Sequence, residues 1–174
     1  MLKKLLLLIP LTLLLLLTAC QGRDRINYLS HQTYPYHAHG LLTLDGTEYE
    51  VLVSVRQAGD LLLQVIRPEA LSGAVFELRE GEVTVSCGTL TEIWQDGGYA
   101  AEEGILLAAR IFSLSGDDYH NAGVTKEAGV TYSYAEFHVE GGTVTVYRQK
   151  GLSQPDRITA ELNGHTLSFR YMNE

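Results

Sequence analysis

Gly104-Ile-Leu-Leu-Ala-Ala-Arg-Ile-Phe-Ser-Leu114 is the one stretch beyond residue 34 that clearly predicts a helix. Its length and its alanines favour a helix over a strand. Arg110 is its only charged residue, so the helix is apolar nearly all the way round. A helix of this kind has to be covered on most sides. The fold therefore depends on what surrounds it.

The surrounding sequence, from Tyr34 onward, predicts strands joined by short turns. Alternating apolar residues indicate strands with one buried face, and the dipeptides Asp45-Gly46 and Asn163-Gly164 suit two-residue hairpin turns. We expect about nine strands, at residues 42–44, 49–55, 61–67, 73–79, 82–87, 130–140, 143–149, 157–162 and 165–172. Connections of hairpin length predict antiparallel pairing. The expected fold class is α+β, mainly β, with a single antiparallel sheet curling over one apolar helix.

Two stretches between these elements carry more specific expectations. Residues 82–87 alternate most regularly, which predicts that Val83, Val85 and Cys87 face the interior. Cys87 is therefore expected to be a buried thiol. Residues 89–103 are acidic and glycine-rich at their centre, and we expect them to form a loop.

The N-terminal part of the chain has the layout of a secretory signal peptide. Lys3 and Lys4 precede an apolar run from residue 5 to residue 17, shorter than the roughly 20 residues that cross a bilayer. The run ends in Leu17-Thr18-Ala19-Cys20, which resembles the lipobox of bacterial lipoproteins. That resemblance implies cleavage between Ala19 and Cys20 and a diacylglyceryl group on the Cys20 thiol. We therefore expect residues 1–19 to be a signal peptide.

The expected mature protein is an extracytoplasmic domain tied to a bacterial membrane through Cys20. Residues 20–33 form a short polar tether, and residues 34–174 form the domain. Cleavage leaves 155 residues, the size of one domain, and lowers the bases from 13 to 11 against 21 acids, a net charge of −10. This acidity argues against a nucleic-acid partner. Once Cys20 is lipidated, Cys87 is the only free thiol, so no intramolecular disulfide can form.

Two segments resemble the LolA/LppX-like superfamily of extracytoplasmic lipoprotein-handling and lipid-binding proteins, in the style of short clostridial lipoproteins that include a spore-germination lipoprotein. They are Pro68-Glu69-Ala70-Leu71-Ser72-Gly73-Ala74-Val75-Phe76 and Gln154-Pro155-Asp156-Arg157-Ile158-Thr159-Ala160, separated by the single helix. The resemblance implies an open half-barrel whose apolar concave face is closed by the helix. In relatives that face holds acyl chains, or the fold docks onto a partner enzyme. The chain departs from periplasmic carriers because it lacks their long N-terminal helix and keeps its own anchor.

No polar motif predicts catalysis, a metal or a cofactor other than the acyl lipid. His37 and His39 share a strand face, but the chain shows no compact set of zinc ligands, so we expect surface histidines. The pairs Glu102-Glu103 and Asp117-Asp118 flank the helix and are expected to be solvated. Nucleophile-elbow, metalloprotease and phosphate-loop motifs are absent from the sequence.

The candidate binding site is apolar and lies on the helix. Its residues are Ile105, Leu106, Leu107, Phe112 and Leu114. The alternative is that these residues only fill the core. The function predicted from sequence is a non-catalytic, membrane-anchored binding module for acyl chains or for an envelope protein. A regulatory partner of a cell-wall enzyme in sporulation or germination is one alternative. A hydrolase or metal enzyme with a scattered site is an alternative of a different class.

Overall fold

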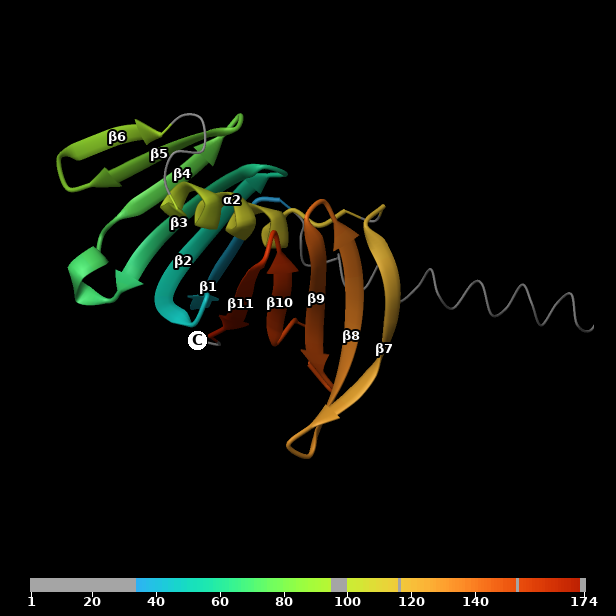
Figure 1. The fold of residues 1–174 in the computed structure, drawn as a ribbon. Coiled ribbons are helices and arrows are strands. Elements are labelled where there is room, and N and C mark those ends of the chain that lie inside the picture. The colour runs from blue at the N-terminus through green and yellow to red at the C-terminus, as the bar shows by residue number, and fades with distance from the viewer. Residues whose placement is uncertain (1–33, 95–99, 116, 153, 173–174) are drawn as a thin grey trace, which may run out of the picture.

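The computed structural model describes residues 34–94, 100–115, 117–152 and 154–172, and these form one large sheet with one α-helix (Figure 1). The strands are β1 (Tyr36–Leu44), β2 (Thr47–Gln57), β3 (Asp60–Arg67), β4 (Val75–Arg79), β5 (Glu82–Cys87), β6 (Leu90–Trp94), β7 (Tyr119–Glu127), β8 (Val130–Val139), β9 (Gly142–Gln149), β10 (Arg157–Leu162) and β11 (His165–Tyr171). The helix is α2 (Ala100–Phe112), and η1 (Glu69–Leu71) is a single 3₁₀ turn.

The sheet consists of two antiparallel meanders that meet at its centre. The strand order is β6-β5-β4-β3-β2-β1-β11-β10-β9-β8-β7, so the first and last strands of the chain pair with each other. Gly40 to Leu44 of β1 lie opposite Tyr171 to Leu167 of β11. The outermost strands, β6 and β7, do not pair, and the sheet is therefore open. The predicted mainly-β architecture with a single antiparallel sheet is confirmed.

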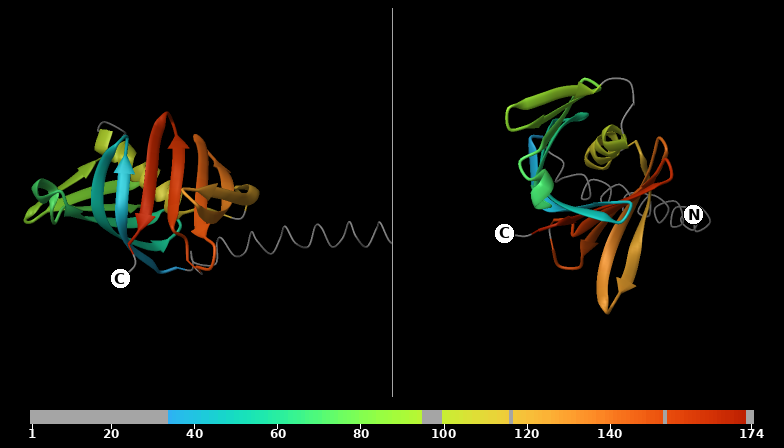
Figure 2. Two further views of the ribbon diagram at one scale, coloured as in Figure 1. Left: turned by 90° about the horizontal axis from the view of Figure 1, so that it is seen from below. Right: turned by 60° about the vertical axis from the view of Figure 1, so that its left-hand side comes forward.

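Helix α2 connects the two edges and lies against the concave face (Figure 2, right). A flat sheet of eleven strands would separate its outer strands by about 48 Å, because neighbours lie about 4.8 Å apart. A helix of 13 residues is only about 20 Å long. The connection across the face therefore favours a sheet that curls around the helix.

The inner face of the sheet carries the core. Buried side chains alternate along each central strand, as Val51, Val53 and Val55 do in β2. The interior positions of the other strands and of the helix complete one cluster, which includes Leu61, Leu63, Val83, Ile111, Phe137, Val146, Ile158 and Phe169. Both predicted hairpin turns are present: Asp45 and Gly46, like Asn163 and Gly164, have positive φ at both positions, as a type I′ turn requires.

Three details of the sequence prediction are wrong. The sheet has eleven strands instead of nine, because β6 lies in the expected loop and β7 lies in a stretch for which no strand was predicted. Both are edge strands with mostly exposed or half-exposed residues, so neither shows a strongly buried pattern. The helix begins at Ala100, four residues before Gly104. Cys87 is exposed, because it ends β5 opposite the exposed Leu90, outside the reach of the core.

Gly104 therefore lies inside the helix, where it allows close packing. A Cβ atom added there would lie 2.8 Å from a methyl carbon of Leu44 in β1. The absence of a side chain lets α2 approach the centre of the sheet.

Candidate functional site

The helix residues predicted as a binding face lie mostly in the core. Ile105, Leu107, Phe112 and Leu114 are between 2% and 6% exposed. The Phe112 ring makes an edge contact with Phe169 at 5.0 Å between centroids. In this structure these four side chains fill the concave face.

Leu106 is the member of the predicted set that remains half-exposed. It borders a small hollow of about 230 Å³ at the seam between α2 and the sheet. The hollow is also lined by Gly59, Leu78, Ala109, Arg110 and Ser113.

The predicted anchor lies outside the described residues. Signal cleavage between Ala19 and Cys20, and lipidation of Cys20, therefore stay predictions of the sequence. Among the described residues, no helix has the length and apolar character needed to cross a membrane.

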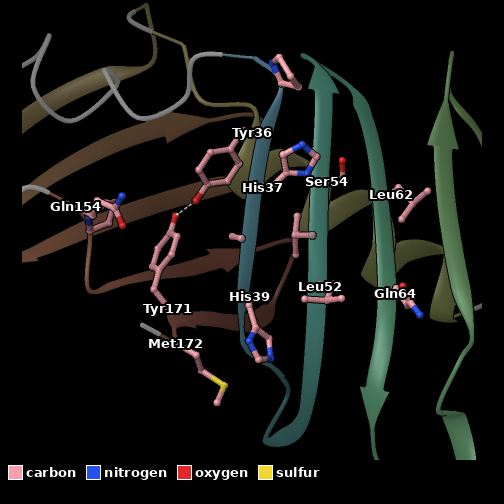
Figure 3. Close-up of a pocket in the computed structure, with 14 residues that line it drawn as sticks. Tyr36, His37, His39, Leu52, Ser54, Leu62, Gln64, Gln154, Tyr171 and Met172 are labelled. Carbon is pink, nitrogen blue, oxygen red and sulfur yellow. Dashed lines mark hydrogen bonds between the residues drawn. The ribbon is translucent and has the colours of Figure 1, made fainter. Parts of the chain in front are cut away.

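A larger groove, of about 800 Å³, lies where β1 begins (Figure 3). The register of β11 with β1 begins at Gly40, and the Met172 N–H donates a 2.9 Å hydrogen bond to the His39 carbonyl oxygen, so residues 36–38 of β1 have an open side. The groove runs over the outer face of β1, β2 and β3 and continues past this open side. Its lining residues are Pro35, Tyr36, His37, Ala38, His39, Leu52, Val53, Ser54, Leu62, Gln64, Gln154, Pro155, Tyr171 and Met172.

The apolar part of the groove is unusual for an outward-facing surface. Leu52 and Met172 are each 41% exposed, and Leu62 is half-buried beside them. Leu52 and Leu62 stand on strands whose other faces already carry the core valines and leucines. These two leucines therefore contribute to the groove and not to the interior.

Two tyrosines separate the groove from the core. The Tyr36 hydroxyl donates a 2.7 Å hydrogen bond to the Tyr171 hydroxyl. Desolvation by burial raises the pKa of Tyr36 to about 12 and also raises the pKa of Tyr171. Both phenols are therefore neutral at physiological pH. On their inner sides, Tyr36 lies 6.4 Å from Phe112 and Tyr171 lies 4.9 Å from Phe169, measured between ring centroids.

Polar groups line the remainder of the groove. His39 Nε2 lies 3.0 Å from a carboxylate oxygen of Glu50, and the other oxygen of Glu50 lies 3.3 Å from Arg67. His37 and Ser54 are register partners on neighbouring strands. Among the described residues, no hydrogen bond joins His37 to Ser54. The groove itself combines apolar side chains with polar ones, and Glu50 and Arg67, the partners in these ion pairs, lie outside its lining.

The sequence contained a signal for this groove that was not interpreted as one. Residues 61–63 are apolar on both strand faces, and Leu52 interrupts an alternation in which every other outward position of β2 is polar. Apolar residues on both faces of an exposed strand indicate a second covered surface.

Comparisons with solved structures return distant likenesses. The chain is similar to the Mycobacterium tuberculosis lipoprotein LppX, with 12% identity, a TM-score of 0.48, and coverage of 86% of this chain and 92% of that one. A LolA superfamily protein from Nitrosomonas europaea has 10% identity, a TM-score of 0.41 and coverage of 88% and 92%. A lipoprotein-sorting protein domain from Vibrio parahaemolyticus, described as putative, has 11% identity, a TM-score of 0.40 and coverage of 79% and 83%.

No protein-family model matches the sequence, and no curated protein matches it. Because the TM-scores all lie below 0.5, the fold described above depends on the observed strand pairing alone.

Proposed function

We propose that the protein is a membrane-anchored, extracytoplasmic module that binds an acyl chain in the groove at the start of β1, without catalysis. The observation that carries this proposal is the pair of exposed apolar side chains Leu52 and Met172 within a groove of about 800 Å³. That volume falls in the range of small-molecule sites, roughly 300–1,000 Å³.

The lining suits an amphiphile better than a purely polar ligand. Leu52, Leu62 and Met172 provide an apolar floor, and each CH₂ group buried there contributes roughly 0.8 kcal/mol. His37 and Gln154 at the rim can hydrogen-bond a polar head group.

The position of the groove relative to the predicted anchor supports the proposal that the groove binds an acyl chain. The tether runs from Cys20 to Tyr34, and fully extended it spans at most about 50 Å. The groove begins at Pro35, directly after this tether. A ligand taken from the membrane would therefore meet the groove close to the bilayer surface.

The test is labelling with a photoactivatable fatty acid, followed by mapping of the labelled peptides in full-length protein. We expect labelling of peptides from β1, β2 and β3. Leu52→Gln should reduce it strongly, because the substitution puts an amide on the apolar floor. Leu90→Gln is the matched control, since Leu90 is 77% exposed on β6, at the edge of the sheet outside the groove lining.

Labelling that is spread over the surface, or that Leu52→Gln leaves unchanged, would contradict the acyl-chain proposal. A partner protein, such as a cell-wall enzyme, is the competing occupant. A partner protein would be detected by cross-links from the groove to a second protein. Leu52→Gln should remove these cross-links and Leu90→Gln should retain them, and the groove should not be labelled by the fatty acid.

The anchor has its own test. Cys20→Ala should abolish the acyl mass and shift the protein from the detergent phase to the aqueous phase or leave an uncleaved precursor. Partitioning equal to that of the unmodified sequence would refute lipidation at Cys20.

A further inference from the structure

Two histidines and a glutamate meet on the outer face of the β7–β8 hairpin. The rings of His120 and His138 are stacked, with centroids 3.8 Å apart and planes 17° apart. A carboxylate oxygen of Glu136 lies 3.2 Å from His138 Nε2 and 4.0 Å from His120 Nε2. One ligand atom from each residue lies within 4.8 Å of the other two.

A β-bulge brings His120 into this cluster. Tyr119 lies opposite Phe137, and Asn121 lies opposite Glu136, so His120 is an extra residue in β7. Extra residues of this kind redirect side chains, and such bulges occur often beside functional sites. Glu136 and His138 share the outer face because they are two residues apart on β8.

The distances match the requirements of a nitrogen-preferring metal ion. Ligand atoms on a tetrahedral Zn²⁺ lie about 3.3–3.4 Å apart, given bond lengths near 2.0–2.1 Å. The separations of 3.2 and 4.0 Å bracket that value. The stacked rings have to open for both Nε2 atoms to face one ion. Both histidine side chains are about half exposed, at 51% and 53%, so they have room to turn.

The charges around the cluster also favour a cation. Glu136 forms ion-pair contacts with both histidines. Two arginines pair with other carboxylates, Arg110 with Glu140 and Arg157 with Glu127. A bound divalent ion would place a positive charge beside the Glu136 carboxylate.

We propose that His120, Glu136 and His138 bind one divalent transition-metal ion of the Zn²⁺ class. Two imidazole nitrogens and one carboxylate oxygen favour Zn²⁺, Cu²⁺ or Ni²⁺ over Ca²⁺ and Mg²⁺, which take oxygen ligands. Three protein ligands leave one coordination position open to solvent. The site lies where β7 begins and β8 ends, at the opposite end of this edge hairpin from its turn at Ala128 and Gly129, which projects beyond the neighbouring strands (Figure 1). This proposal replaces the sequence-based expectation that the protein binds no metal.

Isothermal titration of full-length protein, purified without a histidine tag, with ZnCl₂ tests the proposal. We expect one ion per chain, and a rise of the thermal midpoint on adding Zn²⁺, because an ion that binds only the folded state stabilises it. His120→Gln and His138→Gln should each weaken the binding at least tenfold and abolish the rise. His37→Gln is the matched control, since His37 is also an exposed histidine on an outer strand face.

The metal-free variants are expected to unfold at the same temperature as the unmodified protein, since their side chains are half exposed. If a variant unfolds at a lower temperature, its loss of Zn²⁺ binding does not by itself identify the ligands. NMR of the unmodified protein then identifies them directly, because Zn²⁺ should shift the ring signals of His120 and His138. Absence of binding, or binding that survives both substitutions, overturns the proposal. Weakening by His37→Gln to the same degree overturns it as well.

Discussion

Phe112→Ala distinguishes a helix that fills the core from a helix that acts as a movable lid. Phe112 is 2% exposed and its ring contacts Phe169 and Tyr36. Removing a buried phenylalanine ring costs about 3–5 kcal/mol, through lost burial and the cavity that remains. We expect this full loss, because Phe112 touches aromatic side chains from β1 and β11, the two paired strands at the centre of the sheet, and these cannot all move into the space.

Leu106→Ala is the matched control on the same helix. Leu106 is half-exposed beside the hollow of about 230 Å³, so its truncation should cost well under the 2–5 kcal/mol typical of a buried leucine. The measurement is urea unfolding of both variants. With a slope of about 2 kcal/mol per molar urea, Phe112→Ala should lower the midpoint by roughly 1.5–2.5 M.

Equal and small midpoint shifts for the two variants would refute the packed core. That result, combined with binding of an apolar dye that Phe112→Ala weakens, would support a helix that acts as a movable lid. The helix face predicted from sequence would then be the binding surface in place of the groove at β1.

Three further outcomes follow from the structure. Gly40→Ala should destabilise the protein by at least the roughly 1–3 kcal/mol that ordinary overpacking costs, because the added Cβ would lie 2.4 Å from a carbonyl oxygen of β11. Thermal unfolding measures this loss, and a midpoint within about 1 °C of that of the unmodified protein would contradict it. The raised pKa values of Tyr36 and Tyr171 mean that folding favours the neutral phenols, so their contribution to stability is complete below pH 10 and is lost as the pH rises from about 10 through about 12. Urea midpoints between pH 8 and pH 11 should therefore fall more steeply than in the double variant Tyr36→Phe/Tyr171→Phe, and parallel curves would argue against it. NMR titration should find the pKa of His165 above its usual value, because Asp45 accepts a hydrogen bond from the His165 ring. Asp45→Asn should return the pKa of His165 towards its usual value. A titration of His165 that Asp45→Asn leaves unchanged would show that the pair does not form in solution.

The local sequence determined the elements that have a strong pattern of their own. Asp45-Gly46 and Asn163-Gly164 specify tight hairpin turns because their backbones adopt positive φ readily. Alternation in β2 and β5 identified the inward valines correctly. Residues 104–114 predicted the helix because they are apolar nearly all round, which is typical of a segment that other elements cover.

The tertiary structure alone decided the pairing of β1 with β11 and the features that depend on it. These strands are more than 120 residues apart in sequence, and no local pattern specifies which distant strand will be a neighbour. The open side of residues 36–38, and with it the groove, results from where this pairing stops. Cys87 alternates like a core residue but is exposed because the core ends before the strand does.

The edge strands and the histidine cluster also could not be predicted from the local sequence. Strand β7 is the outermost strand of the sheet and none of its residues is fully buried, so its sequence lacked the burial pattern of a strand. His120 and Glu136 are 16 residues apart and become neighbours through hairpin pairing and one bulge. Sequence patterns report which residues avoid water, since burial is repeated along each element. Polar sites depend on individual contacts between elements, and these exist only after the sheet has formed.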